Sequence, residues 1–596
     1  MADPRSAMSS ARALLAQGRD EEALPLLLRA VRAAPRDADV AIVLSLALSR
    51  CAQPEQAEYH ARRAVTLAPS VAGAHARLGE VLAEQRRLSE ACESQRAASA
   101  LAPDDPDILA GACMTFHLAG LYLDAIRLAR EGLTRVPAHP HLSARLADSL
   151  CVIGRIEEAC RVLREARAQN PDVHFLATDL CAASTFDPSI DARASLELHR
   201  DYARLVARLY PDPPAPRWDV ARDPEKVLRL AVVSPDLRTH PVATFFEPLA
   251  RHADPSRLHI TCYYTGLAED DVSRRIRSLV HAWKHVPVRS ASAAARALHD
   301  MIRANRTDIL LECSGHSERN LLPLCRLRPA PVQITGLGWP NITGLPEVGW
   351  RITDAVVDPA HAESLSSERP LRLDPCFLCY QPFPEAPEPG PSPAARGKGV
   401  TFGCFNAGAK LNDAVLRAFA RVLERVPNST LLLKHTVFRD EQGRAVMIDR
   451  LREAGAPTER VEMLGPTPHR EHLAAHQRVD VALDPFPFNG ATTTCDALYM
   501  GVPVVTLRSE RIGARVGESL LQTVGMTEGV AVSENEYVER AAALASDPAR
   551  LASLRATLRD RVLASPLCDG QAYATRFESA LRAAWQGWLA SPEAAP

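Results

Sequence analysis

The first third of the chain repeats one pattern of small and helix-ending residues at a fixed interval. Prolines recur every 34 residues, at 35, 69, 103, 137 and 171, and an alanine stands 12 residues before each of them. Small residues at fixed offsets let two antiparallel helices approach closely, and proline ends the second helix because it has no N–H for the helical hydrogen-bond ladder. The pattern therefore predicts about five helical hairpins over residues 8–175.

An exact period of 34 is typical of tetratricopeptide repeats (TPRs). Each hairpin has an apolar face that only its neighbours can cover, so the hairpins stack into a superhelix. We expect the groove of this superhelix to bind protein or peptide partners. A surface for dimerisation or for internal packing is the alternative.

Beyond a helical transition predicted over 176–225, short apolar runs alternate with helical patterns. This alternation indicates parallel sheets with helices on both faces. One set fills 226–384 and a second fills 400–590, and a linker at 385–399, rich in proline, glycine and alanine, joins them. We therefore predict two Rossmann-like lobes with a ligand-binding cleft at the carboxyl ends of their strands.

Composition limits the class of partner. The 596 residues are 46% hydrophobic and carry a net charge of −2, so no global basic field exists to hold nucleic acid. The chain has no apolar run long enough for a membrane span and no secretory leader, which favours the cytoplasm. Its 14 cysteines are scattered. One CxxC pair, Cys376 and Cys379, lacks the second pair that a zinc ribbon needs, and we expect reduced thiols.

The segment NGATTTCDALYMG follows a predicted strand and opens a helix at Thr492, Thr493 and Thr494. The first N–H groups of a helix are unsatisfied and carry partial positive charge, so this end suits a phosphate. Capping by threonine is the alternative, but capping needs only one such residue. Asp496, expected in the first turn, could accept hydrogen bonds from a ribose.

Lysine is rare in this chain, and Lys410 lies in a strand–loop–helix connection at the predicted cleft. There its compact ammonium can neutralise a diphosphate. His240 occupies the corresponding loop of the first lobe, as a base or as a hydrogen-bond partner of phosphate. His472 and His476 have the i, i+4 spacing of metal ligands, but no third ligand is evident, so we expect a nucleotide contact and no metal.

Several segments resemble a known family. Together with the repeats, SPDLRTHP, LRPAPVQITGLGWPNITGLP, FGCFNAGAKLND and DPFPFNGATTTCDALYMGVPVVTL are similar to the protein O-GlcNAc transferase and SPINDLY group. The resemblance implies an α-helical TPR superhelix followed by a GT-B fold of two Rossmann-like lobes. It also implies an inverting, metal-independent glycosyltransferase. ECSGH, WPNITGLP, DPCFLCY and NGATTTCDALYMG look closer to the SPINDLY branch, which includes protein O-fucosyltransferases that use GDP-fucose.

The resemblance implies a role for each matching residue. His240 matches the active-site histidine, and Lys410 matches the lysine that contacts the diphosphate and steadies the leaving group. The donor-binding positions are Pro468, His469, His472, Ala491, Thr492, Thr493 and Asp496. This chain departs from the GlcNAc branch at Ala491, where that branch has histidine, and at Ala407, where it has glutamine. Both departures bear on uridine and GlcNAc specificity.

The implied reaction is attack of a Ser or Thr hydroxyl on the anomeric carbon of a nucleotide sugar. UDP-GlcNAc is the expected donor, GDP-fucose is the alternative, and no further cofactor is implied. His240, Asp300 and a relay through water and phosphate remain candidates for the base. A non-catalytic TPR scaffold and a transferase acting on a glycan or small molecule are the rival functions. Protein acceptors along the groove and a homodimer through the TPRs are the expected partners, with no nucleic acid or membrane.

Overall fold

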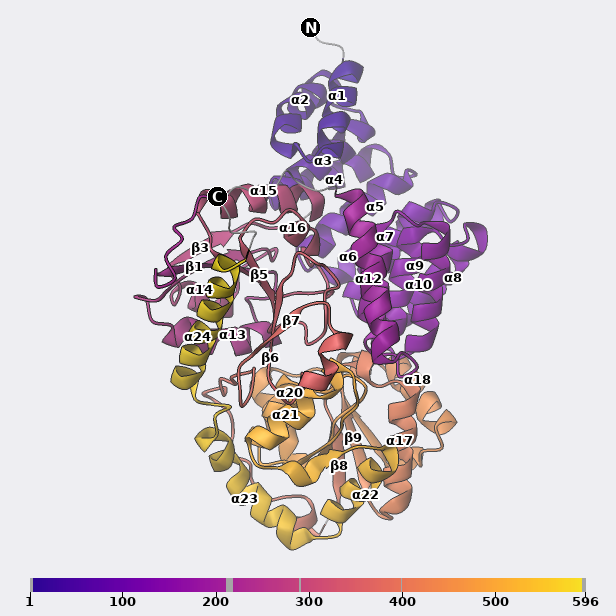
Figure 1. Cartoon of the computed structure of the whole chain (residues 1–596). Coiled ribbons are helices and arrows are strands. Elements are labelled where there is room, and N and C mark those ends of the chain that lie inside the picture. Colours follow the sequence, from indigo (N-terminus) through magenta and orange to yellow (C-terminus); the bar gives the residue numbers. More distant parts are fainter. Residues whose placement is uncertain (1–3, 211–217, 289–290, 398, 592–596) are drawn as a thin grey trace. The chain divides into compact units, whose positions relative to one another are not determined.

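The structure is a computed structural model that describes residues 4–210, 218–288, 291–397 and 399–591. It separates into two compact units, one of residues 1–153 with 157–176 and one of residues 154–156 with 177–596 (Figure 1). Part of the predicted transition and position 398 of the predicted linker lie outside the described residues. Within the described residues, no helix is both long and apolar enough to cross a membrane.

Antiparallel helix pairs build the first unit. They are α1 (Pro4–Ala16), α2 (Asp20–Ala33), α3 (Ala38–Arg50), α4 (Pro54–Leu67), α5 (Ala72–Glu84), α6 (Leu88–Leu101), α7 (Pro106–Leu118), α8 (Tyr122–Arg135), α9 (Pro140–Val152) and α10 (Ile156–Gln169). Each even-numbered helix ends two residues before a repeat proline. The repeated alanines, at 23, 57, 91, 125 and 159, are completely buried. The predicted hairpin repeat is confirmed, with small residues at the helix contacts.

Two further helices, α11 (His174–Ser184) and α12 (Ala192–Leu209), lead into the sheets. The first lobe is a parallel sheet of β1 (Leu228–Ser234), β2 (Leu258–Tyr264), β3 (Ala282–His285), β4 (Ile309–Glu312), β5 (Val332–Thr335), β6 (Trp350–Thr353) and β7 (Arg369–Arg372), in the order β3-β2-β1-β4-β5-β6-β7. Its helices are α13 (Pro241–His252), α14 (Asp271–Arg277), α15 (Ala291–Ala304) and α16 (Leu322–Arg326).

The second lobe is a parallel sheet of β8 (Thr401–Cys404), β9 (Thr430–Lys434), β10 (Val461–Leu464), β11 (Val481–Leu483), β12 (Val504–Leu507) and β13 (Val530–Ala531), in the order β10-β9-β8-β11-β12-β13. Its helices are α17 (Asp413–Arg425), α18 (Glu441–Glu453), α19 (His469–Ala475), α20 (Thr492–Tyr499), α21 (Val516–Thr523), α22 (Glu534–Ala545) and α23 (Pro548–Ala564). The two Rossmann-like lobes of the prediction are confirmed.

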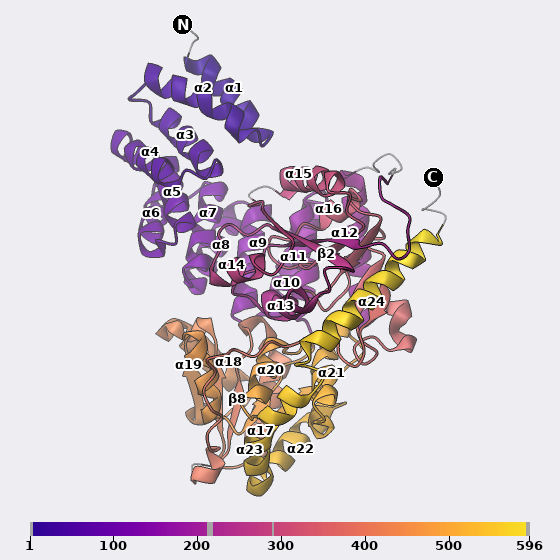
Figure 2. The same ribbon diagram turned by 90° about the vertical axis from the view of Figure 1, so that its left-hand side faces the viewer.

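The last helix, α24 (Gly570–Leu589), returns to the first lobe, where it packs against α13 (Figure 2). The indole N–H of Trp585 donates to the carbonyl oxygen of Asp223 at 3.1 Å, and Arg582 donates to that of Pro224 at 2.7 Å. These bonds tie the end of the chain to the segment that precedes β1.

Both sheets reverse their strand order beside their first strand, at β1–β4 and at β8–β11. Ligands of open α/β sheets bind at such reversals, beyond the carboxyl ends of the strands. The loop after β1 carries His240, the loop after β8 carries Lys410, and the loop after β11 leads to Thr492. The fold therefore places the predicted site residues at the ligand-binding edges.

Candidate active site

Lys410 ends a short 3₁₀ turn (Gly408–Lys410) that follows β8. Its Nζ donates to the carbonyl oxygen of Asn489 at 2.6 Å and to Oδ1 of Asn406 at 3.4 Å. It also lies 4.8 Å from the centroid of the Phe488 ring. Burial lowers the pKa of Lys410 to about 8, and the nearby Asp484 carboxylate opposes this shift. The structure thus holds an ammonium group at the β8–β11 reversal.

The start of α20 lies beside this ammonium. The Thr493 hydroxyl donates to Oδ1 of Asn406 at 2.9 Å, so Asn406 accepts hydrogen bonds from both Thr493 and Lys410. Ala491 precedes the helix and has no side chain to cap it. The Thr492 hydroxyl is buried and has no partner within the described part of the chain. A cation and the open N-terminus of a helix therefore converge, which is the arrangement that binds an anion.

Asp484, directly after β11, holds the turn that precedes α20. Its carboxylate accepts hydrogen bonds from the backbone N–H of Gly490 at 2.6 Å and from the Thr506 hydroxyl at 2.7 Å. Burial raises the pKa of Asp484 to about 6. Neither Asp484 nor Asn406 was predicted from the sequence. The available signal was a polar residue placed within two positions of the end of an apolar strand run.

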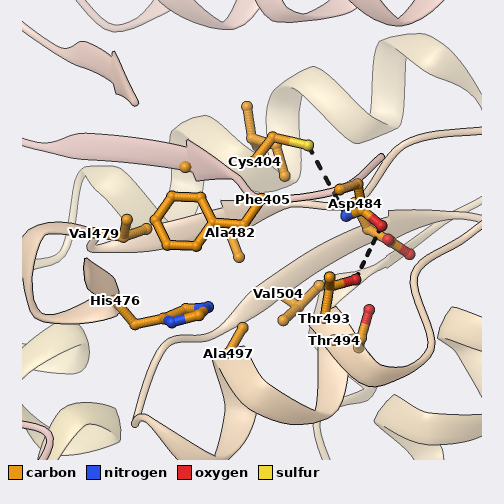
Figure 3. A pocket seen from close by; sticks show the side chains of 13 residues that line it. Cys404, Phe405, His476, Val479, Ala482, Asp484, Thr493, Thr494, Ala497 and Val504 are labelled. Atoms are coloured by element: carbon orange, nitrogen blue, oxygen red, sulfur yellow. Dashed lines mark hydrogen bonds between the residues drawn. The ribbon is translucent and has the colours of Figure 1, made fainter. Parts of the chain in front are cut away.

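A pocket lies between β8, β11, β12 and α20 (Figure 3). The Phe405 ring lies 4.6 Å from the His476 ring, centroid to centroid, and meets the His472 ring edge to face with centroids 5.8 Å apart. The other lining residues include Val479, Ala482, Ala497 and Val504. The cavity therefore has apolar and aromatic walls, and its polar side, which includes Asn406 and Thr493, adjoins the ammonium and the helix start.

Pro468 precedes α19, and His469 and His472 lie on that helix. Their rings are stacked, with centroids 6.1 Å apart and planes inclined by 12°. Burial, assisted by the charge of Lys434, lowers the pKa of His472 to about 4. At neutral pH this imidazole is uncharged, so it acts as a hydrogen-bond partner and not as a cation.

Asp496 is the fifth residue of α20, one turn deeper than the first turn in which we expected it. The Tyr380 hydroxyl donates to its Oδ1 at 2.6 Å, and His472 Nε2 lies 3.9 Å from its Oδ2. Burial raises the pKa of Asp496 to about 7. Tyr380 was not predicted from the sequence, and the ribose contact of Asp496 stays a prediction.

Comparison with known proteins identifies the family. The profile of glycosyl transferase family 41 matches residues 215–379 and 395–577, which is more than half of the chain. The chain belongs to glycosyl transferase family 41. The predicted resemblance to the O-GlcNAc transferase and SPINDLY group is therefore confirmed.

Two relatives of this family 41 chain come from plants. It is 40% identical over 395 residues to the probable UDP-N-acetylglucosamine–peptide N-acetylglucosaminyltransferase SPINDLY of Solanum lycopersicum, covering 65% of this chain and 42% of that protein. The protein of the same name from Arabidopsis thaliana is 39% identical, with 65% and 43% covered. The match thus spans less than half the length of these relatives.

A solved structure is similar over nearly the whole chain. A mutant of the O-GlcNAc transferase of Thermobaculum terrenum is 29% identical, with 93% of this chain and 98% of that chain covered and a TM-score of 0.76. The likeness extends over the repeats and both lobes. It confirms the predicted TPR superhelix followed by a GT-B fold.

In this family 41 chain, His240 precedes α13, and its Nδ1 accepts a hydrogen bond from the backbone N–H of Val242 at 3.3 Å. Burial lowers the pKa of His240. The neutral ring therefore carries its proton on Nε2, since Nδ1 must offer a lone pair to Val242. In this tautomer Nε2 can donate a hydrogen bond, and the role of His240 as a base stays a prediction. Asp300 lies on α15 with 82% of its side chain exposed, as an ordinary surface acid does.

Proposed function

We propose that this chain transfers a sugar from a nucleoside diphosphate donor to Ser or Thr hydroxyls of proteins. The observation that carries the proposal is the convergence of Lys410 and the start of α20 on Asn406. A departing diphosphate gains negative charge in the transition state, and preorganised donors that meet this charge stabilise it by several kcal/mol. UDP-GlcNAc is the donor that we expect, as in the names of the plant relatives.

In this reaction the acceptor hydroxyl attacks the anomeric carbon, the bond from that carbon to the diphosphate oxygen breaks, and the configuration inverts. Lys410 and the first N–H groups of α20 receive the diphosphate. His240 donates from Nε2 to an oxygen of the donor, and the acceptor's proton leaves through water and phosphate. The nucleotide sugar supplies the leaving group itself, so the proposal assigns no step to a metal or further cofactor.

GDP-fucose is the second candidate donor, and Ala407 and Ala491 favour it. Ala407 is exposed and Ala491 is half-buried. Because an alanine side chain has no polar atom, neither residue can offer a donor the amide or imidazole that the GlcNAc branch has at these positions. Two methyl groups leave more room and fewer hydrogen bonds beside the phosphate site than glutamine and histidine would.

We further propose that the TPR unit supplies the surface for the protein acceptor, because its stacked hairpins form a far larger surface than a sugar requires. A homodimer through this unit is the alternative use of the same surface. We propose the cytoplasm as the place of action, where both nucleotide sugars and reduced thiols are at hand.

The test is incubation of the full chain with UDP-GlcNAc or GDP-fucose and a peptide library, with products identified by mass spectrometry. Transfer from one donor that disappears in Lys410→Met supports the proposal and identifies the sugar. A folded chain that transfers from neither donor and binds no nucleoside diphosphate is instead a scaffold. Turnover without any peptide indicates a glycan or small-molecule acceptor.

A further inference from the structure

A buried cysteine and two buried histidines meet away from the nucleotide site. Cys181 lies on α11, His199 on α12 and His316 in the loop after β4, all within the second unit. One ligand atom from each lies within 4.8 Å of the others. The residues are at most 1% exposed, so the cluster is sealed from solvent. These three residues have no part in the proposed transfer reaction.

The hydrogen bonds of both histidines leave one nitrogen lone pair unused. His199 Nδ1 lies 2.7 Å from the carbonyl oxygen of Ser195, and His316 Nε2 lies 2.9 Å from that of Thr343. A carbonyl oxygen only accepts, so these two nitrogens carry the protons. His199 Nε2 and His316 Nδ1 are buried and have no hydrogen-bond partner among the residues that the structure describes. Two buried acceptor atoms that receive no hydrogen bond lower the stability of the fold, unless both bind a cation.

Protonation of the rings does not solve this problem. Burial lowers the pKa of His199 to about 4, and burial together with the neighbouring His199 lowers the pKa of His316 well below its usual value. Both rings are therefore neutral at physiological pH, which is the form that binds metals. A carbonyl oxygen that holds the other ring nitrogen is also the usual support of a metal-bound histidine.

The loop that carries His316 is held in place. The carboxylate of Glu312 accepts hydrogen bonds from the backbone N–H of Ser314 at 2.7 Å and of Gly315 at 2.8 Å. A Cβ at Gly315 would overlap the Trp339 ring, so that indole packs directly on the loop backbone. The Tyr202 ring meets the His316 ring edge to face at 4.6 Å. A ligand on such a loop is preorganised.

We propose that Cys181, His199 and His316 bind one d¹⁰ metal ion, Zn²⁺ or Cu⁺, through a thiolate and two neutral imidazoles. Thiolate and imidazole are the ligands that these ions prefer. Atoms bound at about 2.0–2.3 Å from one ion are at most about 4.6 Å apart, so binding contracts the cluster slightly. The thiol proton leaves to solvent as the metal–sulfur bond forms. The ion ties α11, α12 and the loop after β4 together.

The test is the metal content of the full chain, produced without a polyhistidine tag and measured by mass spectrometry of the elements. We expect about one zinc or copper per chain. Reconstitution of the chelated chain with Zn²⁺ or, without oxygen, with Cu⁺ identifies the ion. Co²⁺ as a probe should give the strong near-ultraviolet absorption of a cobalt–thiolate bond.

Cys181→Ser should abolish this absorption, whereas Cys113→Ser, a buried helical cysteine in the TPR unit, should leave it unchanged. Far-ultraviolet circular dichroism checks that both variants fold, and His316→Gln gives a second test without altering the thiol. The proposal is overturned if the folded wild-type chain binds neither ion in stoichiometric amount. It is also overturned if the cobalt absorption survives in folded Cys181→Ser.

Discussion

At the scale of single residues, the proposed reaction should depend most on Lys410, whose ammonium is held by Asn489 and Asn406. We expect Lys410→Met to reduce the rate of sugar transfer by about 10²–10³-fold, because removal of one preorganised donor to a developing anion has this effect. Calorimetry should show weaker binding of UDP or GDP. Lys284→Met, at an exposed position of β3, is the matched control. Equal affinity in both variants would contradict the assignment.

The same lysine should make nucleotide binding depend on pH. Because burial lowers the pKa of Lys410 to about 8, the ammonium is charged below this pH and loses its proton above it. We therefore expect the dissociation constant of the nucleoside diphosphate to rise as pH increases through about 8. In Lys410→Arg the guanidinium stays charged, so the rise should vanish even if affinity is lower. Titration calorimetry across this range measures both, and a flat wild-type profile speaks against the prediction.

Tyr380 and Asp496 form a buried hydrogen-bonded pair, and its loss should destabilise the second compact unit (residues 154–156 with 177–596). In Tyr380→Phe the carboxylate keeps its burial but loses the 2.6 Å hydrogen bond. We expect a cost of about 1–3 kcal/mol in the free energy of unfolding. Burial raises the pKa of Asp496 to about 7, whereas the pKa of an aspartate in the unfolded chain is about 4. The free-energy cost of ionising Asp496 in the folded protein therefore grows as pH rises from about 4 through 7. Denaturant titration at both ends of this pH range measures the free energy of unfolding, and Tyr59→Phe, at an exposed position, is the control.

The local pattern was enough to place Lys410 and Thr492–Thr494 at one sheet edge, because each follows a strand of the same lobe. The sequence did not predict three further residues, because they matter through contacts with residues that are distant in the sequence. They are Asn406, Asp484 and Tyr380. Asn406 meets Thr493 across 87 residues, and Tyr380 meets Asp496 across 116. A polar residue after a strand is common, and only the folded register shows which of them share a hydrogen bond.

At the scale of elements, the turn before α20 has no room for a side chain at Gly490. A Cβ there would lie 2.5 Å from Thr493 Oγ1 and 2.9 Å from Asp484 Oδ1. We expect Gly490→Ala to displace both groups, to weaken nucleoside diphosphate binding about tenfold or more, and to cost about 1–3 kcal/mol of stability. Gly73→Ala on α5 meets nothing within 4 Å and should be neutral or slightly stabilising. Unchanged nucleotide affinity in Gly490→Ala would show that the turn tolerates the displacement.

Element prediction succeeded where the period was strong, including the edge strand β10, which lies within the apolar run at 460–467, but it missed the edge strands β3, β7 and β13. The 34-residue repeat and the buried central strands were evident because small or apolar residues recur at regular spacing. β3 and β7 lack an apolar run, since their sequences are AWKH and RPLR, and all but one of their residues are partly or fully exposed. β13 is only two residues long. Edge strands are stabilised mainly by hydrogen bonds to one neighbour, which leaves little trace in the side-chain pattern.

At the scale of the whole molecule, each compact unit contains a hydrophobic core of its own. One core joins residues of α1–α6, including Leu44, and another joins residues of α11, α12 and the first lobe, including Tyr202. Because a ligand stabilises only the unit that binds it, saturating UDP or GDP should raise the unfolding temperature of residues 177–596 and leave that of the repeats unchanged. At 100 times the dissociation constant the gain is about 2.7 kcal/mol.

Leu44→Ala provides the reciprocal perturbation, because this side chain is fully buried in the repeat core. It should cost about 2–5 kcal/mol in the TPR unit alone and should leave nucleotide binding unchanged. Hydrogen exchange read by mass spectrometry assigns each effect to its residues, and calorimetry separates the two transitions. If the nucleotide and Leu44→Ala shift a single common transition, the units unfold as one body, and acceptor binding to the repeats is then energetically coupled to the donor site.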